Sequence, residues 1–381
     1  MTDAIRFECA GGDGAARRGV LHTAHGAVQT PAFMPVGTQA TVKTLGSEDL
    51  EALGVAMSLA NTYHLYLRPG VEVVEAAGGL HRFMACHHAL LTDSGGFQVL
   101  SLSDLNRVRD DGVEFRSHLD GSRHLLTPEL AVDVQARLGA DIVMCLDECV
   151  GADADRAAHQ RAVRRTQDWA ARCRGVRGAR FDTHGYPQAL FGIVQGGTDP
   201  ELRRESASGL VQLDFPGYAI GGLAVGEPKP VMLETVATTA ALLPVDRPRY
   251  LMGVGYPEDL VRCVARGVDL FDCVLPTRNA RNGMAFTRRG KLGVRHAALA
   301  RDERPLDPDC ECRVCRRYSR AYVRHLQQAG EILGLRLVTY HNLAFYLWLM
   351  QAMREAIAAA RFDAWQRDFF AAYETDPSEK L

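Results

Sequence analysis

The sequence contains no apolar run close to the roughly 20 residues that a helix needs to cross a bilayer. Residues 1–20 contain no apolar core of the signal-peptide type. Neither sign of charge is in excess, since the net charge at pH 7 is −2. These absences predict a cytoplasmic protein without a membrane partner. A nucleic-acid partner would have to bind at a local basic patch, because the bulk charge offers no attraction.

Acidic residues are also absent between Cys273 and Arg295, a stretch that is rich in arginine. Asp272 directly precedes it, inside a short apolar run that we expect to be a buried strand breaking at Pro276 into a loop. A carboxylate beside a cationic loop suggests an acid that works on a polyanion. The alternative is an aspartate that caps the next turn beside solvated arginines, since both features are common.

The sequence also lacks a glycine-rich phosphate-binding fingerprint after its first buried strand, which argues against an open doubly wound sheet. Short apolar runs instead alternate with helical segments, as in a parallel sheet covered on both sides. The predicted strands are 32–36, 55–60, 89–92, 142–146, 190–194, 218–220, 250–252 and 270–275. Eight such units over about 250 residues predict an α/β fold of the (β/α)8 TIM-barrel type. We expect an N-terminal antiparallel sheet (1–30) that caps the barrel, a catalytic barrel (31–295 and 341–370), a zinc-binding insertion (296–340) and a tail (371–381).

Polar residues and glycines stand where these strands end, which in a barrel is the face that carries the active site. They are Asn61, Asp93, Asp147, Gln195, Gly222-Leu223, Met252-Gly253 and Asp272. Asp147 is suited to accept two hydrogen bonds from a donor pair such as that of guanine, while Gln195 and the backbone near Gly222 donate to a carbonyl. Asp93 and Asp272 then remain as the carboxylate pair that cleavage of a glycosidic bond requires. The alternative is a hydrogen-bonded polar network at the barrel mouth, with Phe97 in the core rather than stacked on a base.

Most of the 10 cysteines are scattered in apolar surroundings, but Cys310, Cys312 and Cys315 are clustered. Three thiolates at this spacing predict a tetrahedral zinc site with one further ligand. His325 and His341 are the nearest histidines that follow, and the spacing does not choose between them. A closed site of this kind is structural. An iron–sulfur cluster is the alternative, although the spacing matches no standard run.

Several segments together resemble the tRNA-guanine transglycosylases of the bacterial type. They are Thr92–Val99, Leu146–Cys149, Gly192–Gly197, Gly221–Glu227 and Phe271–Arg278, together with the cysteine cluster and His341, and the match extends from about residue 5 to 370. The resemblance implies a barrel with a zinc subdomain. It also implies exchange of the wobble guanine of the tRNAs for Asp, Asn, His and Tyr for 7-aminomethyl-7-deazaguanine (preQ1), a step towards queuosine.

The resemblance also implies a role for each matching residue. Asp272 would be the nucleophile that forms a covalent RNA–enzyme intermediate, and Asp93 the general acid/base. Asp147, Gln195, Gly222 and Leu223 would hold the base edge, and Phe97 and Met252 would sandwich its faces, with Gly253 and Cys149 beside them. Arg278 and Arg281, with Thr277, match the loop that meets the anticodon loop. One structural Zn²⁺ per subunit would be held by Cys310, Cys312, Cys315 and His341.

Cys149 and Val225 match the bacterial members, so the preference for preQ1 over queuine rests on the resemblance. A homodimer is expected as well, with Tyr318, Tyr322 and His325 on one helix face as a candidate surface or, alternatively, as local packing. A hydrolase of the same fold and a non-catalytic RNA-binding subunit are the rival functions. The second is disfavoured because both carboxylates are present.

Overall fold

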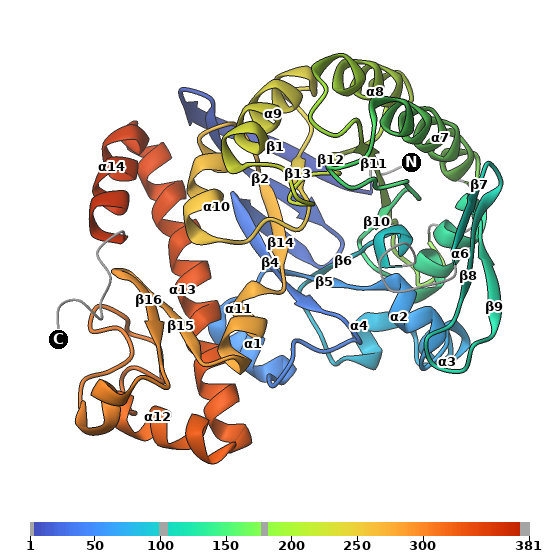
Figure 1. Ribbon diagram of the computed structural model, residues 1–381. Helices are drawn as coiled ribbons and strands as arrows, with labels where there is room; N and C mark the ends of the chain where they lie inside the picture. Colours follow the sequence, from blue (N-terminus) through green and yellow to red (C-terminus); the bar gives the residue numbers. More distant parts are fainter. Residues whose placement is uncertain (1–3, 99–105, 177–181, 374–381) are drawn as a thin grey trace.

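A closed barrel of parallel strands forms the centre of the structure, a computed structural model that describes residues 4–98, 106–176 and 182–373. All of its neighbouring strands pair in parallel (Figure 1). In chain order the strands are β4 (Ala32–Gly37), β5 (Met57–Ala60), β6 (Ala89–Thr92), β10 (Ile142–Met144), β11 (Ala189–Val194), β12 (Tyr218–Ile220), β13 (Arg249–Leu251) and β14 (Leu270–Cys273). The predicted barrel is confirmed, and each of the eight expected apolar runs supplies one strand.

An antiparallel sheet precedes the barrel, as expected, and is formed by β1 (Arg6–Asp13), β2 (Ala16–Thr23) and β3 (Gly26–Thr30). Its side chains Leu21 and Val28 are buried against the barrel interior. Arg17 of this sheet forms a buried ion pair with Asp269, where its Nε donates to Oδ1 at 2.9 Å. Asp269 immediately precedes β14, at the opposite end of that strand from Asp272. The sheet is therefore anchored to the amino-terminal end of the barrel and leaves the other end free for a site.

Helices cover the outside of the barrel, and their ends follow ordinary capping rules. α6 begins at Pro128, where the Thr127 hydroxyl accepts a hydrogen bond from the backbone N–H of Leu130, and it ends before Gly139, whose φ is +77°. Among the described residues, the others before β14 are α1 (Ser47–Leu53), α2 (Thr62–Leu67), α3 (Val71–Ala76), α4 (Gly79–Phe83), α7 (Arg156–Gly175), α8 (Pro200–Gln212), α9 (Lys229–Leu242) and α10 (Pro257–Val264).

The segments that follow β14 and β6 differ from the sequence-based expectation. The segment after Asp272 is not a loop, because β14 ends at Cys273 and α11 (Leu275–Arg281) follows at once, with Pro276 in its first turn. A further antiparallel sheet lies between β6 and α6 and consists of β7 (Arg107–Arg109), β8 (Gly112–Arg116) and β9 (Arg123–Leu126). Its strands are short and its outer face is charged, so they left no clear apolar pattern in the sequence.

The C-terminal part of the described chain packs beside α11 (Figure 1) and carries the cysteine cluster. Its elements are β15 (Met284–Thr287), β16 (Gly290–Gly293), η1 (Ala297–Arg301), α12 (Arg320–Ala329), α13 (Ile332–Ala358) and α14 (Phe362–Tyr373). The long helix α13 begins at Ile332, inside the expected insertion 296–340, and Tyr318 precedes α12 instead of lying on it. Residues 374–381 of the expected tail lie outside the described residues, while residues 371–373 end α14.

Candidate active site

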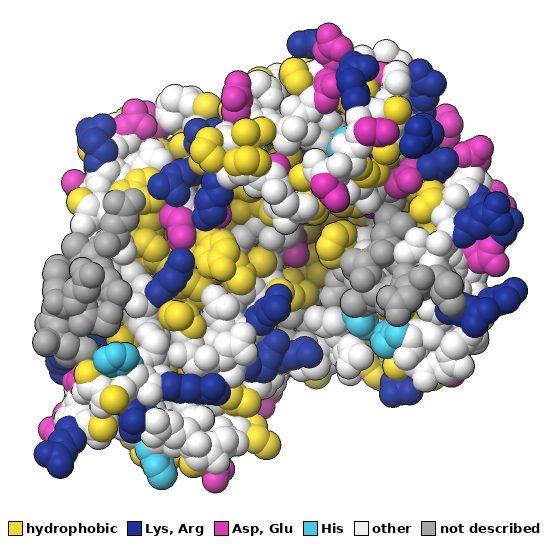
Figure 2. Space-filling model, viewed as in Figure 1, with side chains coloured by type: hydrophobic (Ala, Val, Ile, Leu, Met, Phe, Trp, Pro, Cys, Tyr) yellow, Lys and Arg dark blue, Asp and Glu magenta, His cyan; other side chains and the backbone are white. Residues whose placement is uncertain are grey.

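The carboxyl ends of the barrel strands surround a cavity of about 400 Å³. All ten residues predicted for catalysis or base binding line it: Asp272, Asp93, Asp147, Gln195, Gly222, Leu223, Phe97, Met252, Gly253 and Cys149. Figure 2 shows the hollow near the centre of the face, with apolar walls and an acidic side chain inside. The barrel therefore brings together residues that are up to 179 positions apart in the chain, from Asp93 to Asp272.

Asp272 is held by two hydrogen-bond donors at the cavity wall. The Tyr250 hydroxyl donates to its Oδ1 at 2.6 Å, and the backbone N–H of Gly253 donates to the same oxygen at 2.9 Å. Burial raises the pKa of the Asp272 carboxyl above its ordinary value, and the bond from Tyr250 opposes that rise. Since both of these donors bind Oδ1, Oδ2 is the oxygen that remains for a bond to a ligand.

Asp93 is more deeply buried than Asp272 and is held by the two residues that follow β5, Asn61 and Thr62. The Asn61 side-chain amide donates to Oδ2, and the backbone N–H of Thr62 donates to Oδ1 at 2.8 Å. Burial raises the pKa of Asp93 to about 6, against the opposing effect of these hydrogen bonds, and the nearby Asp272 carboxylate raises it further. A carboxyl group with such a pKa is suited to both accept and release a proton near neutral pH.

A second set of hydrogen-bonding groups lines the same cavity. Asp147 accepts from the Ser94 hydroxyl at 3.1 Å and from the Gln195 side-chain amide at 2.7 Å. Burial raises the pKa of Asp147 to about 6. Gly222 has φ +65°, and a Cβ there would lie 2.3 Å from Oε1 of Gln195. Glycine is therefore required at this position, where the backbone approaches the amide that a base edge would meet.

The walls of the cavity are largely apolar. Phe97 is 52% exposed, which is unusual for a phenylalanine and leaves its ring free to stack on a planar ligand. Leu223 is buried, while Met252 and Cys149 are half-buried. Burial raises the pKa of the Cys149 thiol to about 12, so it stays neutral and acts as an apolar wall.

Comparison with known proteins gives this arrangement a family. The chain matches the family model described as "Queuine tRNA-ribosyltransferase" over residues 12–375. The chain belongs to the queuine tRNA-ribosyltransferase family. Three relatives carry the name "Queuine tRNA-ribosyltransferase". The protein of Desulforudis audaxviator is 58% identical over 94% of this chain and 95% of its own length. That of Thermoanaerobacter pseudethanolicus is 56% identical over 94% of both chains, and that of Symbiobacterium thermophilum is 55% identical over 99% of this chain and 94% of its own.

Membership of the queuine tRNA-ribosyltransferase family confirms the resemblance seen in the sequence and the prediction of a pentosyltransferase. In the described part of the chain, no helix combines the length and apolar character needed to span a bilayer.

Three residues of the site were not assigned a role from the sequence. Tyr250 is fully buried within β13 and begins the apolar run 250–252, a pattern typical of the core, although its hydroxyl reaches Asp272. Ser94 donates to Asp147. Glu227 accepts from the backbone N–H of Val225 at 3.0 Å and also from that of Ala224, and so orders the segment after Leu223. The signal that was available is proximity to a strand end for Ser94 and Tyr250, and membership of the segment Gly221–Glu227 for Glu227. Neither signal says what a side chain contacts.

The three residues expected to meet RNA lie on α11, outside the cavity. Arg278 is exposed and Arg281 is half-buried, and they lie one turn apart on the same helix face. Burial, and next the charge of Arg278, lowers the pKa of Arg281, and Nη1 of Arg281 has no hydrogen-bond partner among the described residues. Thr277 is only 3% exposed and its hydroxyl donates to the carbonyl of Val274, so its side chain belongs to the helix start.

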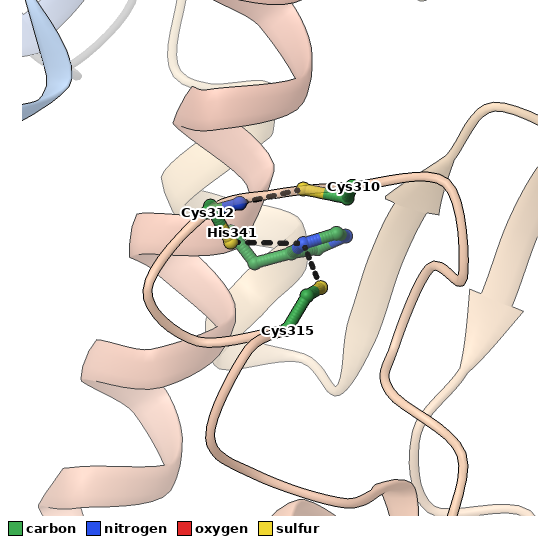
Figure 3. A group of neighbouring side chains, drawn as sticks. All are labelled: Cys310, Cys312, Cys315 and His341. Carbon is green, nitrogen blue, oxygen red and sulfur yellow. Dashed lines mark hydrogen bonds between the residues drawn. The ribbon is translucent and has the colours of Figure 1, made fainter.

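The cysteine cluster forms a separate candidate metal site, shown in Figure 3. One ligand atom from each of Cys310, Cys312, Cys315 and His341 lies within 4.8 Å of the others. Nδ1 of His341 is 3.3 Å from the Cys315 sulfur, while its Nε2 lies 2.8 Å from the carbonyl oxygen of Phe286. This carbonyl fixes Nε2 as the protonated nitrogen, so that Nδ1 presents a lone pair to the thiols. His325, the other histidine that the spacing allowed, is exposed on α12 and takes no part in the cluster.

Proposed function

We propose that the chain exchanges the wobble guanine of the tRNAs for Asp, Asn, His and Tyr for preQ1 through a covalent intermediate. The observation that supports this most is a single cavity that holds both a carboxylate pair and a polar edge suited to guanine. Asp147 would accept from the N1–H and amino groups of the base, and Gln195 and the Gly222 backbone would face its carbonyl. The base would have to leave its stack to enter the barrel mouth.

In the first half-reaction, Oδ2 of Asp272 would attack the anomeric carbon of the wobble nucleotide. The bond from this carbon to guanine breaks, its electrons leave with guanine, and guanine takes a proton from Asp93. In the second half, the incoming base gives a proton to Asp93 while its nitrogen attacks the same carbon, which releases the Asp272 carboxylate. Since one base leaves before the other arrives, the kinetics should be ping-pong.

Labelled guanine supplied with cognate tRNA tests this proposal. Incorporation of the label supports exchange, whereas release of guanine from tRNA without incorporation would favour a hydrolase, and binding without either reaction would favour an RNA-binding subunit. Parallel reactions with preQ1 and queuine test the substrate: release of labelled guanine by queuine but not by preQ1 would contradict the bacterial preference. A tRNA substrate also supports the cytoplasm as the location, which cell fractionation tests.

The pH dependence of base binding should follow Asp147. Its pKa of about 6 is higher than that of an ordinary aspartate, so the protonated form persists to higher pH. Below pH 6 the carboxylate loses an acceptor for the base edge, and the KM for free guanine should rise about tenfold per pH unit. Steady-state exchange between pH 4.5 and 8 measures this rise. Asp147→Asn should bind guanine weakly at every pH and remove the inflection, and an unchanged inflection would assign it to another group.

We propose that Arg278 and Arg281 bind phosphates of the anticodon loop. Neither forms an ion pair with a carboxylate within the described ranges, and Lys and Arg side chains lie beside the hollow near α11 (Figures 1 and 2). Arg278→Ala should raise the KM for tRNA and reduce the slope of log KM against log salt by roughly 0.7 to 1, since one phosphate contact is lost. The KM for free guanine should not change. Arg247→Ala, on a loop before β13, is the control, and an equal effect there would refute the assignment.

We also propose that two copies associate through the hairpin of α12 and α13. Tyr318 stacks on Tyr322 with ring centroids 5.6 Å apart. Tyr322 is 41% and Ile332 is 74% exposed, so this hairpin presents large apolar side chains that a second copy would cover. Tyr322→Asp should halve the mass measured by light scattering at micromolar concentration, whereas Val245→Asp, at an exposed apolar residue on another loop, should not. A monomeric wild type, or a dimer that survives Tyr322→Asp, would contradict this surface.

A further inference from the structure

Arg203 is a buried cation without a carboxylate partner. It lies in the first turn of α8, its side chain has no exposed surface, and in the described part of the chain no carboxylate forms an ion pair with it. Burial lowers the pKa of its guanidinium to about 10, so it remains charged at neutral pH. Charged groups are rarely buried in this way unless their hydrogen bonds are satisfied.

All three guanidinium nitrogens of Arg203 donate to backbone carbonyls. Nε donates to Gly197 at 2.7 Å and Nη1 donates to Val194 at 3.0 Å. Nη2 makes a longer bond of 3.4 Å to Gly222. The carbonyl of Val194 directly precedes Gln195 in the chain, and that of Gly197 lies two residues after it. The carbonyl of Gly222 follows the next strand, β12. A single planar group therefore connects the two loops that carry the proposed base edge.

The same helix holds Gln195 from a second point. The Ser206 hydroxyl accepts the backbone N–H of Gln195 at 3.0 Å, and Ser206 lies three residues after Arg203 in α8. With its N–H and the carbonyls on both sides fixed, the Gln195 backbone has little freedom, and its amide meets Asp147 at 2.7 Å. The loops themselves are rich in glycine, and Gly196, Gly197 and Gly222 all have positive φ. Such backbone does not hold one conformation unaided.

We propose that Arg203 is a positioning residue for base recognition, which aligns Gln195 and the Gly222 backbone on one base edge without touching the base. This rests on the proposed function. Its loss should weaken binding of the free base, which this edge alone holds, more than binding of tRNA, whose wobble guanine uses the same edge but which is also bound through α11. A purely structural arginine would instead lower the stability of the fold without a preference for either substrate.

Arg203→Met and Arg203→Lys are the test variants, and Arg249→Lys is the matched control. Arg249 is also a buried arginine that donates to backbone carbonyls, those of Leu243 and Gly267, but it lies at the amino-terminal end of β13. The KM for guanine in exchange should rise roughly tenfold to hundredfold in Arg203→Met, the size expected for lost hydrogen bonds to a charged donor. The KM for tRNA should rise less, because the phosphate contacts proposed for α11 do not depend on Arg203. Arg203→Lys keeps the charge but cannot span three carbonyls, so its KM for guanine should lie between those of wild type and Arg203→Met.

Arg249→Lys should lower Tm without changing the ratio of the two KM values. Equal changes of both KM values in Arg203→Lys, or a guanine KM unchanged from wild type, would overturn the proposal even if Arg203→Met does not fold. Equilibrium binding of labelled guanine to the free protein separates this result from the proposed function. A wild type that binds guanine but exchanges none would refute the exchange reaction, and weaker guanine binding by Arg203→Lys would still support the positioning role.

Discussion

Asp272→Asn is expected to abolish both exchange and the covalent RNA adduct. The neutral amide is isosteric but a far weaker nucleophile, so no bond to the anomeric carbon should form, and the exchange rate should fall by at least roughly 10³-fold. The fold should persist, because the amide oxygen still accepts from the Tyr250 hydroxyl and the Gly253 N–H. A denaturing gel of protein incubated with labelled tRNA measures the adduct, and guanine incorporation measures the rate.

Two comparisons make the Asp272 experiment decisive. Asp246→Asn removes an exposed carboxylate outside the cavity and should leave both adduct and rate as in wild type. Mass spectrometry of the digested wild-type adduct should find the nucleotide on the peptide that contains Asp272. An adduct that persists in Asp272→Asn would contradict Asp272 as the nucleophile. A modified peptide that contains Asp93 would assign that role to Asp93.

Loss of a cysteine ligand is the change with the largest expected effect on stability. We propose that Cys310, Cys312, Cys315 and His341 hold one Zn²⁺ per subunit, because three sulfurs and one imidazole nitrogen are a closed tetrahedral donor set. Structural zinc contributes about 10–16 kcal/mol of binding free energy in small domains, as much as the whole stability of a typical protein. Cys312→Ser should therefore lose the metal and unfold the region around α12, which hydrogen exchange and elemental analysis measure.

The matched control for the metal site is Cys9→Ser, because Cys9 is an exposed cysteine outside the cluster. This variant should keep one zinc per chain and the Tm of wild type. A strong chelator should reproduce the effect of Cys312→Ser in the wild-type protein. If the purified protein contains no zinc, or if Cys312→Ser keeps the metal and the protection of α12, the zinc assignment is wrong.

The fold and most of the cavity could be predicted because their signals are local in the sequence. Continuous apolar runs such as 89–92 and 190–194 mark buried parallel strands, and Thr127, Pro128 and Gly139 mark the ends of α6. Once eight strands are counted, barrel geometry alone gathers Asp93, Asp147 and Asp272 at one mouth. The clustered cysteines indicated a metal site in the same way, since three of its four ligands lie within six residues.

Other features depend on contacts that no local pattern contains. The sequence treated the segment after Asp272 as a loop, whereas Pro276 sits in the first turn of α11 and directs the arginines along a helix. In the sequence Tyr250 lies in an apolar run and Arg203 belongs to no motif, and only the fold shows that the first holds Asp272 and the second joins two loops. The spacing likewise left the choice between His325 and His341 open. The resemblance implied His341, and the fold brings the Phe286 carbonyl and the three thiols around its imidazole.

The sequence by itself determined the barrel, the carboxylates at its mouth and the cysteine cluster, because periodicity and spacing are properties of neighbouring residues. Only the tertiary structure decided the protonation and orientation of these groups. The pKa values of Asp93 and Asp147 rise to about 6 because both carboxylates are buried. Their hydrogen bonds come from Asn61, which is 32 positions before Asp93, and from Gln195, which is 48 positions after Asp147. Burial and long-range hydrogen bonding arise only when distant segments pack together, and they turn a ring of polar residues into a site.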